Sequence, residues 1–195
     1  MKFRNSIAIT IGVVLVLLAA GNWQTFAQKS EGIEPSGTEL FTHPRIKDHG
    51  KIVRLPDAAE QPRDGSKICV DVTAGGSSDA INPAIEKVAR FVNIYAGAGR
   101  RPADVQITVI LHGKATLAAL NNESYANQLR ADRNPNVPLF EKLKEAGVEI
   151  LVCGQSLAHK GGRHEDVASE VRIAVSALTV NVNRQLDGYV FIPLH

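Results

Sequence analysis

The sequence has few of the residues from which covalent and metal sites are built. The chain of 195 residues has two cysteines, Cys69 and Cys153, and no C-x-x-C motif. A dithiol redox site within one chain is therefore not indicated, and no zinc-ligand spacing is present.

Net charge is also scarce. The whole chain has 22 basic and 20 acidic residues, but Lys2 and Arg4 lie in an N-terminal segment that resembles an export signal. Without residues 1–27 the two signs balance. A balanced chain has no basic surface of the kind that binds nucleic acid, so we expect no nucleic-acid partner.

Two common enzyme motifs are missing. The glycine-rich stretch "TAGGSSD" at residues 73–79 lacks both nucleotide-binding fingerprints, and a turn before a helix explains it as well. Ser156 has no G-x-S-x-G context, so a hydrolase nucleophile is not supported. We expect no cofactor.

One long apolar run is present, "IAITIGVVLVLLAA" at residues 7–20. It follows two positive charges and precedes "TFA", which has small residues where a signal peptidase cleaves. Its 14 residues are fewer than the roughly 20 that a membrane-spanning helix needs. The pattern predicts a signal peptide over residues 1–27, with cleavage after Ala27, no later membrane span and a periplasmic or otherwise exported protein; an uncleaved membrane anchor is the alternative.

The remaining chain divides into an arm and a domain. Residues 28–66 are polar and broken by proline and glycine, which predicts an extended arm with one short strand at 51–55. Residues 67–195 alternate strand-like and helix-like segments. The strands are expected in order near 67–74, 104–113, 148–154, 171–175 and 189–194. This alternation predicts an α/β domain, a three-layer α/β/α sandwich around a five-stranded, mostly parallel sheet.

Two helix starts are clear in the sequence. Asn82 before Pro83 is a good N-cap, and an apolar stripe at helical spacing follows it. Ser176 is expected to cap a second helix that continues to Asp187. Along that helix three apolar residues share one face: Leu178, Val182 and Leu186.

The candidate site lies beyond the carboxyl ends of the strands, where open parallel sheets bind their ligands. Cys153 ends the strand "VEILV" just before a possible helix start, an arrangement that favours a thiolate. His112 ends the preceding strand of the chain and is placed to tune that thiol or act as its base, if the two strands are neighbours. A buried, inert Cys153 is the alternative.

Cys69 has a different setting, because it stands inside a strand between Ile68 and Val70. We expect it to be a packing residue. A disulfide with Cys153 is not expected, since one cysteine is near the start of its strand and the other at the end of its own. Asp71, also inside the first strand, either serves the site or is satisfied by backbone partners.

A metal site has weak support. His112, Cys153 and His159 could supply one thiolate and two imidazole ligands to a metal ion. Gly161 and Gly162, however, indicate that the segment after His159 is a surface loop. We therefore predict no metal and keep these three residues as weak candidates.

Several segments together resemble the exported branch of the DsrE/DsrF-like family (YchN-like fold). They are "HPRIKDHGKIVRLP", "INPAIEKVARFVNIYA", "ITVILHGKATLAALNNESY", "LKEAGVEILVCGQSLAHKGG" and "VRIAVSALTVNVNRQLDGYVFIPL". The resemblance implies that the second and third strands are neighbours, with the first strand on the other side of the second. It also implies a homo-oligomer (trimer or hexamer), and a carrier cysteine at Cys153 that holds sulfur as a persulfide.

Three functions remain open on the sequence. The first is a thiol-based sulfur carrier or sulfur-relay accessory that uses Cys153 and meets a sulfur donor or acceptor protein. The second is a non-catalytic, oligomeric module that binds a small ligand or a metal. The third is a structural or partner-binding protein in which the thiol is buried. Whether the chain is an enzyme is left open.

Overall fold

The computed structural model describes residues 40–195. The predicted signal peptide and the beginning of the arm lie outside the described residues. The domain is built on a five-stranded sheet in the order β6-β5-β4-β3-β7, and every pair of neighbours is parallel. The expected five-stranded sheet is confirmed, and it is parallel throughout. Its strands are β3 (Ser66–Val72), β4 (Val105–Leu111), β5 (Glu149–Cys153), β6 (Arg172–Ala174) and β7 (Val190–Leu194).

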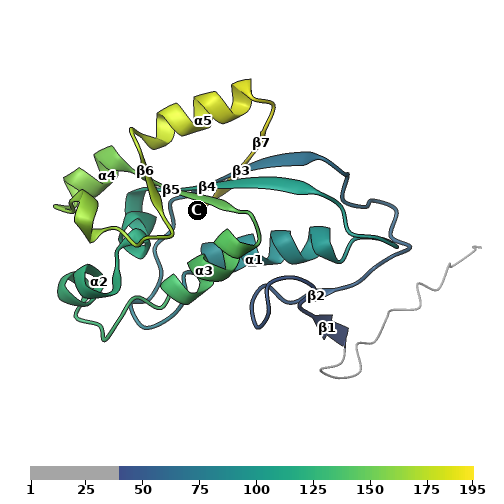
Figure 1. Ribbon diagram of the computed structural model, residues 1–195, viewed down its shortest axis with the longest axis horizontal. Coiled ribbons are helices and arrows are strands. Elements are labelled where there is room, and N and C mark those ends of the chain that lie inside the picture. The colour runs from purple at the N-terminus through teal and green to yellow at the C-terminus, as the bar shows by residue number, and fades with distance from the viewer. Residues whose placement is uncertain (1–39) are drawn as a thin grey trace, which may run out of the picture. The chain divides into compact units, whose positions relative to one another are not determined.

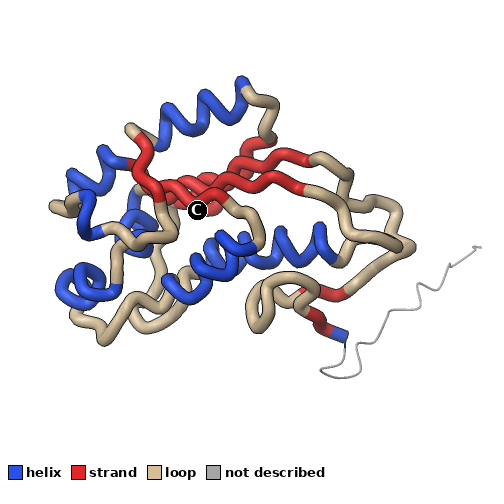
Figure 2. Tube along the Cα trace, in the orientation of Figure 1, coloured by secondary structure: helices blue, strands red, loops and turns tan. Residues whose placement is uncertain are grey.

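The central strands are apolar on both sides because helices cover both faces of the sheet. Helices α1 (Pro83–Ala96) and α3 (Val137–Glu145) lie on one face, and α5 (Ala177–Leu186) lies on the other (Figure 1, Figure 2). Three shorter helical elements, η2 (Gly113–Ala119), α2 (Asn122–Leu129) and α4 (Gly154–His159), follow β4 and β5. A last single turn, η3 (His164–Asp166), precedes β6. This is the expected α/β/α sandwich.

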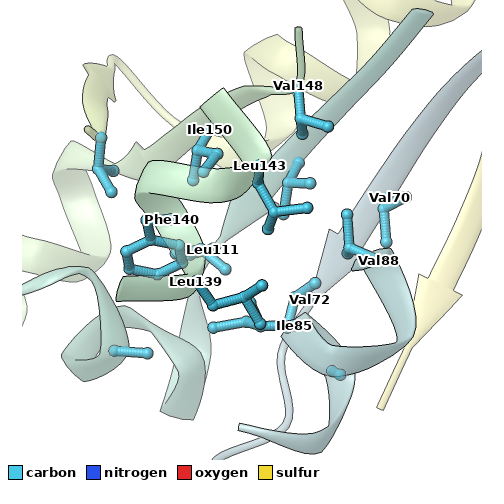
Figure 3. Close-up of a cluster of buried hydrophobic side chains, with 14 of the residues drawn as sticks. Val70, Val72, Ile85, Val88, Leu111, Leu139, Phe140, Leu143, Val148 and Ile150 are labelled. Atoms are coloured by element: carbon cyan, nitrogen blue, oxygen red, sulfur yellow. The ribbon is translucent and has the colours of Figure 1, made fainter. Parts of the chain in front are cut away.

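The main core lies between the sheet and the α1–α3 layer (Figure 3). Phe140 and Leu143 of α3 and Val88 of α1 are fully buried there against the strands. A smaller cluster lies on the opposite face under α5 and contains both cysteines. The sheet therefore separates a large apolar core from a thinner, more polar layer.

Both expected helix caps are present. The Asn82 side chain accepts a hydrogen bond from Ala84 N at 2.8 Å, and Pro83 begins α1. The Ser176 hydroxyl accepts one from Thr179 N at 3.0 Å at the start of α5. Such caps satisfy amide groups that the first helical turn leaves unpaired.

Helix α5 places three large apolar residues on the side away from the sheet. Leu178, Val182 and Leu186 share one face, as expected, and are 78%, 56% and 81% exposed. Toward the sheet it packs Ala177 and Val180, together with polar side chains described below.

The described part of the arm folds back on the outer side of α1. Its strands β1 (Phe41–Thr42) and β2 (Ile52–Val53) form an antiparallel pair, and β2 lies within the strand predicted at 51–55. Asn93 of α1, fully buried, accepts hydrogen bonds from the amides of Arg45 and Ile46 and donates to carbonyls of the same loop. The arm thus covers part of its own domain.

A glycine permits this close contact. Gly50 has φ +60° and its amide donates to Glu86 Oε1 of α1 at 2.6 Å. A Cβ at this position would lie 2.2 Å from Arg90 N. Only glycine combines that backbone angle with so near an approach to the helix backbone.

Candidate functional site

The carboxyl ends of β3, β4 and β5 meet at one edge of the sheet. Register pairs Val72 with Leu111 and Leu111 with Val152. His112 and Cys153 come one residue later on adjacent strands, so they lie level with each other at that edge. The neighbour relation that the resemblance implied is confirmed by the strand order.

Both side chains belong to the face that α5 covers. Leu151 and Cys153 pack in the cluster beneath α5 with Ile110, and alternate residues of a strand point to the same face. His112 follows Ile110 by two and joins that face. The strand order and the parallel register of the sheet therefore place a histidine and a cysteine side by side.

Cys153 is buried, at 6% exposed, as in the alternative prediction of a buried thiol, and its sulfur has a backbone partner. Ser156 N donates to Cys153 Sγ at 3.4 Å, so the cysteine side chain caps α4. The Ser156 hydroxyl lies 2.6 Å from Thr116 Oγ1, which in turn donates to Gly113 O at 3.0 Å. These contacts tie the start of α4 to the turn after β4 and fix the place of the sulfur.

The His112 ring is held by Asp71 rather than by the thiol. His112 Nε2 lies 2.9 Å from Asp71 Oδ1, and Asn181 Nδ2 of α5 donates to the same oxygen at 2.9 Å. Asp71 is 5% exposed. Because a carboxylate only accepts, Nε2 carries the proton and a neutral ring keeps Nδ1 as its basic atom.

The sequence left open whether Asp71 serves the site or bonds only to the backbone, and its hydrogen bonds favour the first. The carboxylate is satisfied by two side chains, His112 and Asn181, and not by backbone groups alone. The polar residues beneath α5 therefore link the helix to the histidine at the edge. An aspartate inside the apolar run "ICVDV" was the available signal, whereas nothing in the sequence indicated Asn181 or Thr116.

Cys69 is the more deeply buried of the two thiols. It is fully buried, and burial, helped by the negative charge of Asp71, raises the pKa of its thiol to about 11. Its Sγ donates to Asn181 Oδ1 at 3.7 Å. The packing role predicted for Cys69 is confirmed.

The two cysteines are free, as expected. Cys69 is level with Thr108, and Thr108 is level with Glu149 at the start of β5. Cys153 lies at the other end of β5 and two strands away. A disulfide between them would need a different register.

His195 follows β7, whose carboxyl end lies at the same edge of the sheet, whereas His49 lies in the arm. His159 ends α4 and is exposed, and His49 pairs with Glu86 at 3.2 Å in the arm. His195 Nδ1 lies 2.9 Å from Thr73 Oγ1. Within residues 40–195, no three histidine, cysteine or acidic side chains are grouped closely enough to hold a metal ion. The weak metal candidates His112, Cys153 and His159 thus do not form a ligand set.

The glycine-rich stretch after β3 borders a small cavity. The cavity holds about 210 Å³ and is lined by Gly75, Gly76, Lys114 and Tyr125 among others. The Tyr125 hydroxyl donates to Ser78 O at 3.2 Å, which closes the loop over α2. As the sequence indicated, this stretch forms a turn that precedes a helix.

The sequence model of the DsrE/DsrF-like family matches residues 67–194, which include all five strands of the sheet except the first residue of β3. The chain belongs to the DsrE/DsrF-like family. One solved structure similar to this family member is a protein of unknown function, MTH1491, from Methanobacterium thermoautotrophicum. It shares 16% identity and a TM-score of 0.47, over 66% of this chain and 99% of that one. No curated protein matches the sequence.

No helix in the described part of this DsrE/DsrF-like chain, residues 40–195, has the length and apolar character needed to cross a bilayer.

Proposed function

We propose that this DsrE/DsrF-like protein is an exported sulfur carrier that holds a sulfane sulfur as a persulfide on Cys153. The observation that carries the proposal is the position of this thiol. It ends β5 at the ligand-binding edge of a parallel sheet, with the Ser156 amide directed at its sulfur. An N–H group that donates to sulfur favours the thiolate, which is the nucleophilic form.

The transfer is a displacement at sulfur and needs no external oxidant. The Cys153 thiolate attacks the outer sulfur of a donor persulfide, the donor S–S bond breaks, and the donor leaves as a thiolate. The new S–S bond is on Cys153. An acceptor thiolate later attacks the outer sulfur of Cys153 in the same way and restores the Cys153 thiolate.

His112 has the second role in this proposal. Its basic Nδ1 takes the Cys153 proton, directly or through water, before attack, and Asp71 holds the ring in the tautomer that makes this possible. Asp71 and Asn181 are positioning residues in this account, because they act through His112 rather than on the sulfur.

Export and self-association complete the proposal. The charge and apolar pattern of residues 1–27 supports export, so the donor and acceptor proteins would be found outside the cytoplasm. The resemblance implies a trimer or hexamer. Neither the subcellular site nor the oligomer is needed for the displacement chemistry itself.

Intact mass spectrometry tests the proposal with a matched control in the same chain. The purified protein is treated with a small-molecule persulfide donor, and the mass of one sulfur atom is expected to be added. Cys69→Ser should still gain it, whereas Cys153→Ser should not. His112→Gln should load more slowly but to the same final extent.

Two results would reject the proposal. One is a wild-type chain that gains no sulfur from any donor, which would favour the binding-module alternative. The other is loading that persists in Cys153→Ser and is lost in Cys69→Ser, because the carrier would then be the wrong cysteine.

A further inference from the structure

A cavity of about 710 Å³ lies between α1 and β7, at the end of the sheet opposite to Cys153. Its lining includes Ser66 at the start of β3 and Val190 at the start of β7. The volume is within the range of pockets that hold small organic ligands. The sulfur site, at the carboxyl ends of the strands, does not use this space.

The walls of the cavity are apolar on both sides. Helix α1 contributes Phe91 and Ile94, and the sheet contributes Ile68, Val190 and Ile192. Val190 is 61% exposed, although Ile68, its neighbour in register, is 7% exposed. The two differ because α1 packs against β3, whereas β7 lies at the edge of the sheet. An apolar ligand that displaced water from these walls would gain free energy.

One cation at the cavity has binding capacity left over. Lys67 Nζ donates to Asp187 O at 3.2 Å and lies 5.7 Å from the centre of the Tyr189 ring, whereas an ammonium group has three hydrogens to donate. Among residues 40–195 no carboxylate pairs with Lys67, since the Asp187 carboxylate bonds to Arg184 at 3.3 Å. The lining thus combines apolar walls with an uncompensated positive charge, which favours an anion over a cation.

We propose that this cavity binds an amphipathic carboxylate, which is a single carboxylate group on an apolar chain, as in a fatty acid. The chain lies between α1 and β7, against Ile94 and Val190. The carboxylate lies beside Lys67 and accepts a hydrogen bond from its ammonium group. A charge-assisted hydrogen bond of this kind orients the ligand, and the apolar contacts supply most of the affinity.

The exposed edge of β7 does not suit a second polypeptide that would add a strand there. Thr73 N donates to Leu194 O at 3.1 Å, so Leu194 directs its backbone groups toward β3 and Pro193 directs its own toward solvent. Proline has no N–H group, and on an edge strand it hinders further pairing. A small ligand therefore fits the neighbouring cavity better than an added strand. The inference goes beyond sulfur transfer and stands without it.

Isothermal titration calorimetry with decanoate, kept below its micelle concentration, tests the inference on the purified protein. Decanoate is expected to bind at one site per chain. Shorter carboxylates should bind about four-fold more weakly for each methylene group lost. Lys67→Gln should weaken decanoate binding by about 10-fold and leave 1-decanol binding unchanged, because only the carboxylate uses the charge.

Two variants should close the cavity to both ligands. Ile94→Glu and Val190→Glu each place a carboxylate on an apolar wall, and both side chains are partly exposed, so the fold should tolerate the change. Leu178→Glu is the matched control, because it puts the same charge on an exposed apolar residue of α5, outside the cavity. It should bind decanoate as the wild type does. Cys153→Ser should also bind decanoate normally, which separates this inference from sulfur transfer.

Several results would overturn the inference. One is a wild-type chain that does not bind decanoate, and another is binding that persists unchanged in Ile94→Glu and Val190→Glu. Equal affinity for decanoate and decylammonium would do so as well, because the charge of Lys67 would then have no role. A wild-type dimer that excludes decanoate and dissociates in Val190→Glu would show that a second copy fills the cavity instead.

Discussion

The two cysteines of this chain differ because of where each stands along its strand. Cys69 is in the middle of β3, where α5 and both neighbouring strands close over it. Cys153 is the last residue of β5, where the chain turns into α4 and an amide becomes available to the sulfur. The same residue type is thus a packing group in one place and a candidate nucleophile in the other.

The buried Cys69 thiol should make the protein less stable at alkaline pH. Burial raises its pKa from 9.0 to about 11, so between these values the unfolded chain loses the proton while the folded chain keeps it. The contribution of Cys69 to the free energy of unfolding is therefore fully present below pH 9. It is lost as the pH rises from 9 to 11, which lowers the free energy of unfolding by at most about 2–3 kcal/mol. Urea titrations from pH 8.5 to pH 11 should show this fall.

Cys69→Ala is the control for that slope. The variant loses some stability at every pH because it leaves a small cavity. Its unfolding free energy should nevertheless decline less steeply than that of the wild type above pH 9. Parallel curves for the two proteins would mean that Cys69 does not titrate in this range.

At the candidate site, periodicity predicted some residues and could not predict others. The pattern placed His112 and Cys153 at strand ends, and the resemblance implied that the two strands are neighbours, as the strand order shows. The hydrogen bond from His112 to Asp71 depends on side-chain rotamers, and Asn181 arrives from a helix 110 residues further along. The local spacing of apolar and polar residues in the sequence cannot indicate either contact.

Among the elements, the arm shows how one polar side chain organises a segment without regular structure. Asn93 is fully buried on α1 and satisfies both amides and carbonyls of the loop that contains Arg45 and Gly50. Those backbone groups have left water and need partners. The sequence predicted an extended arm, but its attachment depends on tertiary contacts, of which those of Asn93 and the Gly50–Glu86 hydrogen bond are two.

Asn93→Ala should release the arm. The loss of several buried hydrogen bonds is expected to lower the free energy of unfolding by about 2–4 kcal/mol, because the backbone groups that remain lose their partners. Limited proteolysis should cut within residues 40–66 sooner than in the wild type. Asn183→Ala, an exposed asparagine on α5, is the matched control and should change neither measurement. Unchanged resistance in Asn93→Ala would show that the arm is held by other contacts.

Helix α5 illustrates a limit of reading helices from spacing. Leucine and valine at intervals of four indicate one apolar face, whether that face meets the core or another molecule. In the structure this face does not meet the core, since Asn181 and Arg184 face the sheet. The polar contacts beneath the helix could not be inferred from the stripe itself.

For the molecule as a whole, the order of strands in the sheet determines where chemistry is possible. β3, β4 and β5 are central and parallel, so their carboxyl ends bring Asp71, His112 and Cys153 to one edge although they are far apart in the chain. Alternating strands and helices predicted this fold, because helices bury the central strands on both faces. The export signal stays a prediction, since it lies outside the described residues.

The most direct test of the account is the reactivity of the two thiols in the folded protein. The account predicts that an alkylating reagent under native conditions modifies Cys153, identified by peptide mapping, while Cys69 reacts only after denaturation. Ser156→Pro, which removes the amide that donates to the sulfur, should slow the reaction of Cys153. A folded chain in which Cys153 stays unmodified until it is denatured, or in which Cys69 reacts first, would contradict sulfur transfer through Cys153.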